Sequence, residues 1–178
     1  MKPRKWNLRN MIDEDYTSLE TILGFAQTKN QMLTFRVGNE IYGVEISKII
    51  ELVRLDLENL PKPMPKVPDF ILGVINVRGE IIPVLDLRKK LLLPQKEFDK
   101  FDVIIVLESS DEKLGILVDE VNDVVPIPNE KKSPPPDYIE NIDTRFIFYI
   151  CESKKTIVSL INPDMLLDKG FEKELRQP

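Results

Sequence analysis

The chain has 178 residues, and its 30 acidic and 25 basic residues leave a net charge of −5, which gives phosphate-driven binding of nucleic acid no electrostatic support. It contains no His, which excludes His-activated nucleophiles and the commonest metal ligand, and its single Cys excludes an intramolecular disulfide. No apolar run approaches the roughly 20 residues that a membrane-spanning helix needs. We therefore expect a cytoplasmic protein with a sizeable core, no direct membrane insertion, no metal, no cofactor and none of the most familiar catalytic arrangements.

Residues 1–30 are expected to form an extension outside the main fold. No apolar stretch follows their basic start, so a secretory signal is not expected. Thr17 and Glu20 match a capping box ahead of apolar residues at helical spacing, which predicts a short amphipathic helix in "TSLETILGFAQ". Such a helix either docks on the rest of the protein or binds a partner, and docking or disorder is the simpler interpretation.

Four β-hairpins are predicted between residues 31 and 162. The first is "LTFRVGNEIYGVEI", which turns at Gly38 and Asn39. The second is "GVINVRGEIIPVLDL", which places Arg78 at its turn and Pro83 in the returning strand, a position that indicates an edge or a bulge. The third joins "FDVIIVLE" to "KLGILVDEV", and the fourth joins "RFIFYICE" to "KTIVSLI". Short helices are expected in "LRKKLLL" and in "NPDMLLDKG", the latter with Asn162 as its N-cap.

The chain also carries an internal repeat. The segment "YGVEISKIIELV" (42–53) matches "LGILVDEVNDVV" (114–125) at an offset of 72 residues, with a Gly second in each copy. A proline-rich loop follows each copy, and "IIPVLDL" (81–87) then matches "TIVSLIN" (156–162). Short connections leave no room for crossover helices, so the repeat predicts a mainly β fold of two small antiparallel barrels packed on each other. One barrel is expected over 31–93 and the other over 101–168, with a C-terminal helix and a tail at 169–178.

Three stretches, "FRVGNEIYGVEISKIIELV", "GVINVRGEIIPVLDLRKKL" and "LGILVDEVNDVV", resemble the signature sequences of the CheW-like family of bacterial chemotaxis coupling proteins. The resemblance covers residues 31–168 and implies two five-stranded SH3-like barrels without catalysis. It also implies an adaptor that links the cytoplasmic tips of methyl-accepting chemotaxis receptors to the regulatory domain of the histidine kinase CheA. Such an adaptor is recruited from the cytoplasm to membrane receptor arrays. The extension at 1–30 is longer than the lead-in typical of the family.

The resemblance further implies the residues of the binding surfaces. Those at the family's receptor-coupling positions are Ile49, Glu51, Gly73, Asn76, Arg78, Val103, Gly115 and Val121. For the kinase we expect exposed apolar residues near the proline-rich loop, Leu55, Leu57 and Met64, each of which could equally belong to the core.

Two of these positions are placed to form an ion pair. Arg78 lies beside its turn and Glu51 lies at the end of another predicted strand. On the residues alone, such a pair is an ordinary solvated contact worth about 0 to 1 kcal/mol, whereas the resemblance favours a role in receptor binding. Gly73 and Gly115 also have a structural interpretation, because Gly in a strand permits a bulge or a close backbone approach.

Two other functions remain open on the sequence. A small-barrel regulatory domain could bind a metabolite between its two modules, although the expected interior positions are almost wholly aliphatic and supply few polar groups. An enzyme that uses paired carboxylates, such as Asp111 and Glu112, ranks third because these acids lie in polar stretches typical of solvated turns.

Overall fold

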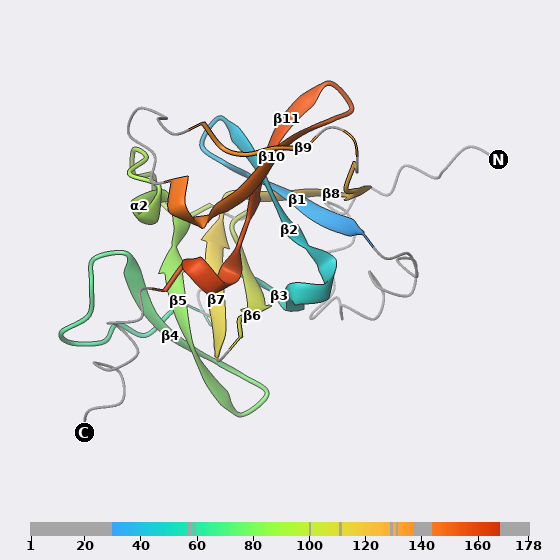
Figure 1. The fold of residues 1–178 in the computed structure, drawn as a ribbon. Coiled ribbons are helices and arrows are strands. Elements are labelled where there is room, and N and C mark those ends of the chain that lie inside the picture. The colour runs from blue at the N-terminus through green and yellow to red at the C-terminus, as the bar shows by residue number, and fades with distance from the viewer. Residues whose placement is uncertain are drawn as a thin grey trace.

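The computed structural model describes residues 30–56, 58, 60–99, 101–110, 112–128, 130, 132–136 and 144–167. The described strands form two sheets, one in the upper half and one in the lower half of Figure 1. The helix expected in residues 17–27 and the tail at 169–178 lie outside the described residues. The prediction of a mainly β fold is confirmed.

The first sheet has six strands in the order β8-β1-β2-β11-β10-β9. Their bounds are β1 Gln31–Val37, β2 Glu40–Glu45, β8 Glu120–Pro126, β9 Lys132–Ser133, β10 Ile147–Ser153 and β11 Thr156–Ile161. The second sheet has five strands in the order β3-β6-β7-β5-β4. Their bounds are β3 Ile49–Arg54, β4 Ile71–Val77, β5 Glu80–Asp86, β6 Val103–Glu108 and β7 Lys113–Val118.

All four predicted hairpins are present, as β1–β2, β4–β5, β6–β7 and β10–β11. The strands in each are antiparallel, and the only parallel contacts among the described strands are β2–β11 and β5–β7. Helical elements are short. They are the 3-10 turns η2 Ile46–Lys48, η3 Thr144–Phe146 and η4 Pro163–Met165, and the α-helix α2 Leu87–Lys90. The two expected helices are therefore single turns over the described residues.

The strand order reveals how the internal repeat is built. Replacing each strand by its counterpart in the other repeat converts β3-β6-β7-β5-β4 into β8-β1-β2-β11-β10, which is the order of the first sheet without β9. The parallel and antiparallel contacts are converted in the same way. Residues 42–53 and 114–125 thus occupy equivalent places, because each segment leaves one sheet and enters the other.

This exchange means that the sheets do not coincide with the expected modules 31–93 and 101–168. In the first repeat, β3 pairs with β6 of the second repeat, and in the second repeat β8 pairs with β1 of the first. Each sheet therefore takes strands from both repeats. The connection at Ile46–Lys48 is too short for β3 to fold back beside β1, so β3 continues into the neighbouring sheet.

The alignment of the fourth hairpin with the second shifts by one residue relative to the sequence match. Asp86 caps α2 by accepting hydrogen bonds from the backbone N–H groups of Arg88 and Lys89, and Asn162 caps η4 in the same manner. The Asp86 N–H donates to the Phe70 carbonyl, as the Asn162 N–H donates to the Phe146 carbonyl. Equivalent residues in these hairpins are therefore 76 positions apart, not 75.

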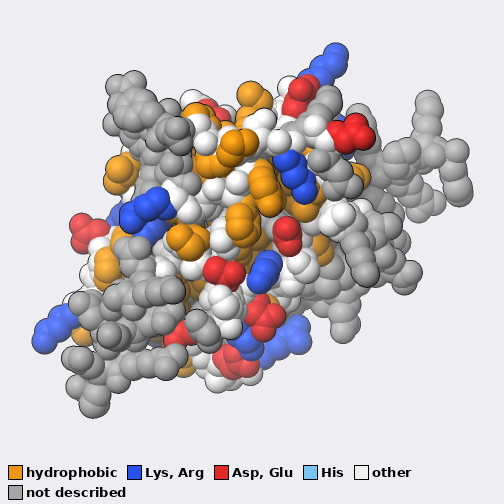
Figure 2. Space-filling model, in the orientation of Figure 1, with side chains coloured by type: hydrophobic (Ala, Val, Ile, Leu, Met, Phe, Trp, Pro, Cys, Tyr) orange, Lys and Arg blue, Asp and Glu red, His pale blue; other side chains and the backbone are white. Residues whose placement is uncertain are grey.

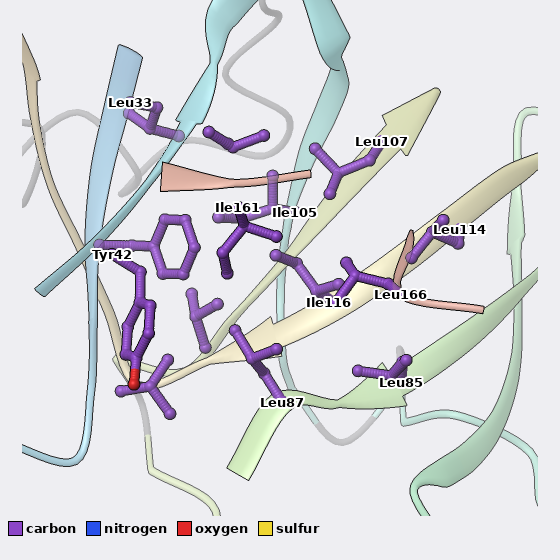
Figure 3. Packing of buried hydrophobic residues seen from close by; sticks show 14 of the residues in the cluster. Leu33, Tyr42, Leu85, Leu87, Ile105, Leu107, Leu114, Ile116, Ile161 and Leu166 are labelled. Atoms are coloured by element: carbon purple, nitrogen blue, oxygen red, sulfur yellow. The ribbon is translucent and has the colours of Figure 1, made fainter. Parts of the chain in front are cut away.

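Buried apolar side chains of the described residues form three clusters. The largest lies between the sheets, and Figure 3 shows Leu33 and Tyr42 of the six-stranded sheet beside Ile105 and Ile116 of the five-stranded sheet. The other two clusters occupy equivalent positions in the two repeats. One contains Met32, Val125, Ile127, Cys151, Val158 and Leu160, and the other contains the counterparts Ile104, Val53, Leu55, Ile75, Ile82 and Val84. A strand such as β6 is buried on both faces because it contributes to two clusters.

A buried ionic network holds the connection between β7 and β8. Asp119 is 5% exposed and accepts hydrogen bonds from Arg88 Nε at 2.9 Å and from the Gly38 N–H at 2.8 Å. Arg88 Nη2 also donates to this carboxylate, so the contact is bidentate. Asp119 therefore links the β1–β2 turn and α2 to the connection between β7 and β8.

Candidate functional site

The β4–β5 turn projects at the lower end of the molecule in Figure 1. Its central residues, Arg78 and Gly79, have φ of 51° and 88°, the positive values of a two-residue turn that matches strand twist. Asn76 completes the turn, since its side-chain oxygen accepts a hydrogen bond of 2.9 Å from the Gly79 N–H. The expected site residue Asn76 thus has a structural task, which is to present Arg78 at the end of the hairpin.

Glu51 on β3 lies under this turn. Its Oε2 is 3.3 Å from Arg78 Nε, and the exposed fractions of the two side chains are 4% and 72%. The ion pair expected from the sequence is therefore present, but the acid is buried and the base is exposed. Glu51 Oε1 is buried and accepts no hydrogen bond from any described residue. The pair differs in this respect from the solvated contact that the residues alone suggested.

A groove of about 520 Å³ runs beside Arg78. The apolar side chains at its wall come from β3, β4, β5 and the loop that precedes β4. The lining residues are Val53, Glu58, Leu60, Lys62, Val74, Ile75, Asn76, Val77, Arg78 and Ile81. Ile81 is 64% exposed and Leu60 is 41% exposed, so the groove offers apolar area to a partner next to a positive charge. Figure 2 shows apolar side chains gathered near the centre of one face of the molecule, with charged side chains below and around them.

A second groove of about 580 Å³ adjoins the first, and Val74 and Ile81 line both grooves. It is lined by Met64 and Pro83 together with residues of the β6–β7 turn, among them Glu108 and Lys113. Lys113 pairs with Glu80 at 2.5 Å across this groove. The β4–β5 hairpin therefore contributes to the walls of both grooves.

Two of the expected site residues are glycines with steric reasons for their identity. A Cβ on Gly73 would lie 2.1 Å from the Lys62 carbonyl oxygen, and the φ of Gly73 is 145°. A Cβ on Gly115 would lie 2.8 Å from Ile104 Cγ2. Gly43, the counterpart of Gly115 in the first repeat, is equally crowded, because a Cβ there would lie 2.9 Å from Met32 Sδ. Gly73 and Gly115 thus permit close packing, as the structural interpretation predicted.

Three further expected site residues are buried in the cluster between the sheets. Ile49, Val103 and Val121 are 6%, 2% and 4% exposed, so they present little surface to a partner. Ile49 and Val121 are counterparts in the repeat, and each lies next to the register shift in the pairing of its strand. The structure places Gly73, Asn76 and Arg78 on the β4–β5 hairpin and brings Glu51 of β3 next to Arg78, whereas the other expected positions are buried.

Of the residues expected at the kinase surface, one is buried in the core and one lies at a groove. Leu55 is 5% exposed and belongs to the cluster of the five-stranded sheet, so the expectation that it is exposed is wrong and its alternative as a core residue holds. Met64 is half-buried and lines the second groove. Leu57 lies outside the described residues.

Sequence reasoning missed Ile81 and Leu60, the exposed apolar residues that flank Arg78. Ile81 carries a weak signal, because "IIPV" places apolar residues at successive positions of a strand, and successive side chains point to opposite faces. One of the two adjacent isoleucines must therefore face away from the core. Leu60 has no comparable pattern, since it lies in an irregular loop.

Burial shifts the pKa values of titratable side chains in the described part of the chain. Burial raises the pKa of Asp86, and the hydrogen bonds from the N–H groups of α2 partly oppose that shift. Burial also raises the pKa of the Cys151 thiol. Among the described residues no three His, Cys, Asp or Glu side chains gather where they could hold a metal. No helix in the described part of the chain is long and apolar enough to cross a membrane.

Comparisons with known proteins agree with this architecture. The model of the CheW-like domain matches residues 31–171. The chain is 33% identical over 137 residues to the chemotaxis protein CheW of Klebsiella aerogenes, covering 77% of this chain and 81% of the relative. It is 30% identical over 145 residues to the chemotaxis protein CheW of Bacillus subtilis, covering 80% and 90%. The crystal structure of the scaffolding protein TtCheW from Thermoanaerobacter tengcongensis matches with a TM-score of 0.73 and 32% identity, over 79% of this chain and 94% of that one. The chain therefore belongs to the CheW-like family and is a non-catalytic adaptor of chemotaxis signalling.

Proposed function

We propose that this chain couples methyl-accepting chemotaxis receptors to the histidine kinase CheA in the cytoplasm, and that the receptor tip binds at the β4–β5 hairpin. The observation that carries the proposal is the pair of buried Glu51 and exposed Arg78 beside an apolar groove, in a chain that the CheW-like model matches over residues 31–171. An apolar groove next to a fixed charge suits the apolar face of an amphipathic helix, and a receptor tip is a helical hairpin.

The expected receptor positions act in two ways under this proposal. Arg78 and Asn76 lie at the surface and are available for direct contact, while Glu51 orients Arg78. Ile49, Val103 and Val121 shape the core between the sheets, so changes there would act by moving the hairpin. Gly73 and Gly115 act through packing.

For the kinase we propose that the regulatory domain of CheA packs against the five-stranded sheet beside Met64. Met64 lines the second groove, whereas Arg78 lines the first. The two partners would then bind at neighbouring grooves that meet at Val74 and Ile81. The rival function, a metabolite between the two modules, is disfavoured because a large cluster of buried apolar side chains fills the space between the sheets.

The test is a pull-down of Arg78→Ala with receptor-tip and CheA regulatory-domain fragments, accompanied by a melting curve. Arg78 is 72% exposed, so its truncation should lower the free energy of unfolding by about 1 kcal/mol or less. Receptor binding should fall by about 2 to 5 kcal/mol, roughly 30-fold or more, because a buried carboxylate loses its partner at the interface. CheA binding should be unchanged.

Lys154→Ala is the matched control, because Lys154 occupies the equivalent turn of the other repeat with φ of 49° and pairs with Asp123. It should retain both partners. Receptor binding that survives Arg78→Ala would contradict the proposed site, and receptor binding lost equally in both variants would show that the effect is not specific to this hairpin.

A further inference from the structure

The ion pair of Glu51 and Arg78 has a counterpart in the other repeat. Asp123 on β8 and Lys154 on the β10–β11 turn occupy the equivalent positions, and their Oδ2 and Nζ atoms lie 2.9 Å apart. The two turns share their backbone conformation, with φ of 51° at Arg78 and 49° at Lys154. They project at opposite ends of the molecule (Figure 1). The counterpart is therefore an internal reference that shows what the fold itself requires at this position.

The reference pair is solvated and fully partnered. The Asp123 side chain is 42% exposed, its Oδ1 accepts a hydrogen bond of 2.9 Å from the Val124 N–H, and its Oδ2 contacts Lys154. Glu51 is 4% exposed, and its Oε1 has no donor among the described residues. A buried carboxylate oxygen without a donor is unfavourable, and the reference pair shows that the fold does not need one here. The difference indicates that a donor comes from a bound partner.

Arg78 supplies the complementary half of the site. It contacts Glu51 through Nε alone, and its Nη1 and Nη2 groups have no partner among the described residues. The site therefore offers unused donors on Arg78 next to an unused acceptor on Glu51. Because the Arg78 side chain is 72% exposed and held by one contact, it is able to rotate about its side-chain bonds toward a bound partner.

We propose that this site recognises a primary amide, the side chain of an Asn or Gln on the receptor tip, and this inference rests on the proposed function. An amide nitrogen donates to Glu51 Oε1 while the amide oxygen accepts from Arg78. A carboxylate would meet Arg78 but leave Oε1 without a donor, and it would approach the acids Glu51 and Glu58. A cation would satisfy Glu51 but approach Arg78. Of these three groups, the amide alone satisfies both Glu51 and Arg78.

The groove defines what flanks the amide. Ile81 and Leu60 are 64% and 41% exposed beside Arg78, so the partner segment carries an apolar side chain close to its Asn or Gln. On a helix, residues three or four positions apart share one face. The recognised element is therefore an apolar residue and an amide residue one helical turn apart.

The test exchanges the amide and the carboxylate across the interface. Each Asn and Gln of a receptor-tip fragment is changed singly to Asp or Glu of the same length, and binding is measured against the wild-type chain and against Glu51→Gln. For one position the acidic change should lower the affinity for the wild-type chain at least tenfold. Glu51→Gln should restore that fragment to within about threefold of the wild-type pair, because the amide introduced on β3 then donates to the new carboxylate and Arg78 pairs with it.

Asp123→Asn is the matched control, and it should neither weaken binding of the wild-type fragment nor rescue any acidic fragment. Melting curves of both variants are recorded so that a folding defect is recognised. If Glu51→Gln is unfolded, Glu51→Asp serves as the second variant. Its shorter side chain withdraws the carboxylate from the partner, so binding of the wild-type fragment should be lost. If the wild-type chain binds the tip but no acidic fragment is rescued, the inference is overturned while the proposed function stands. If the wild-type chain does not bind the tip, both are overturned.

Discussion

At the scale of single residues, two glycines of the β4–β5 hairpin illustrate different constraints. Gly73 and Gly79 both have positive φ, at 145° and 88°. A Cβ on Gly73 would overlap the backbone of Lys62, whereas a Cβ on Gly79 would meet no atom within 4 Å. Gly73 is therefore constrained by both conformation and space, and Gly79 by conformation alone.

The first prediction compares Gly73→Ala with Gly79→Ala. Gly79→Ala should lower the free energy of unfolding by about 1 to 2 kcal/mol, the ordinary cost of a left-handed residue. Gly73→Ala should cost about 3 kcal/mol or more, because the Lys62–Val74 bridge must also separate. Urea denaturation measures both values, and equal losses would contradict the steric argument.

The second prediction concerns Tyr42, which is 1% exposed in the core between the sheets. Burial, with a smaller contribution from the charge of Glu40, raises its pKa from 10.0 to about 12. Between pH 10 and 12 the unfolded chain loses the phenolic proton while the folded chain keeps it, so the free energy of unfolding falls as the pH rises. The loss attributable to Tyr42 should reach about 2 to 3 kcal/mol by the upper end of this range.

Tyr42→Phe separates this effect from other groups that titrate at alkaline pH. Its free energy of unfolding should follow that of the wild-type chain below the ordinary tyrosine pKa of about 10 and fall less steeply above it. Urea denaturation at each pH measures the free energy of unfolding of both proteins. If the two free energies change with pH in the same way over the whole range, Tyr42 is solvated in the folded protein.

At the scale of elements, the positions of α2 and β8 depend on one buried acid. Asp119 accepts hydrogen bonds from Arg88 on α2 and from the β1–β2 turn, and it lies between β7 and β8. Arg36 lies nearby, but its Nη1 is 3.9 Å from Asp119 Oδ2 and its side chain is 40% exposed. Replacing either arginine by alanine removes one positive charge near Asp119. A comparison of the two variants therefore isolates the effect of how deeply the arginine is buried.

The third prediction is that Arg88→Ala lowers the free energy of unfolding by about 3 to 5 kcal/mol, because the buried Asp119 carboxylate loses its bidentate hydrogen-bonded partner. Arg36→Ala should cost about 0 to 1 kcal/mol, the usual value for a solvated pair. Chemical denaturation of the two variants provides the comparison. A loss for Arg36→Ala as large as that for Arg88→Ala would refute the assigned role of burial.

At the scale of the whole molecule, the two repeats are interlocked by the exchange of β3 and β8. Each sheet requires strands from both halves of the chain, and the largest apolar cluster lies between the sheets. A single half would expose that cluster and leave one strand without a partner. The molecule is therefore a cooperative unit even though its sequence is a duplication.

The fourth prediction follows from this exchange. Separate fragments of residues 1–98 and 99–178 should each lack a cooperative melting transition, because β3 has lost β6 and β8 has lost β1. Mixing or coexpressing the fragments should restore a β-rich complex with a transition, measured by circular dichroism and gel filtration. A cooperative transition in either fragment alone would mean that a repeat folds without the exchanged strand.

The local features of the fold follow from the order of the residues alone. All four hairpins, the turns at Gly38 and Arg78, and the N-cap at Asn162 depend on residues close together in the chain, whose φ preferences and apolar alternation act in any context. The repeat also establishes that residues 42–53 and 114–125 are equivalent. Membership of the CheW-like family rests on these local signatures as well.

Tertiary packing selects the sheet that each strand joins and the apolar residues that reach the surface. The alternation of β3 fits either sheet, and its partner β6 lies about fifty residues away, so pairing depends on closure of the core between the sheets. The same packing buries Leu55, leaves Ile81 exposed and places Glu51 under Arg78. Burial is a property of neighbours from several strands, and for that reason the chemistry of this site could be established only from the folded chain.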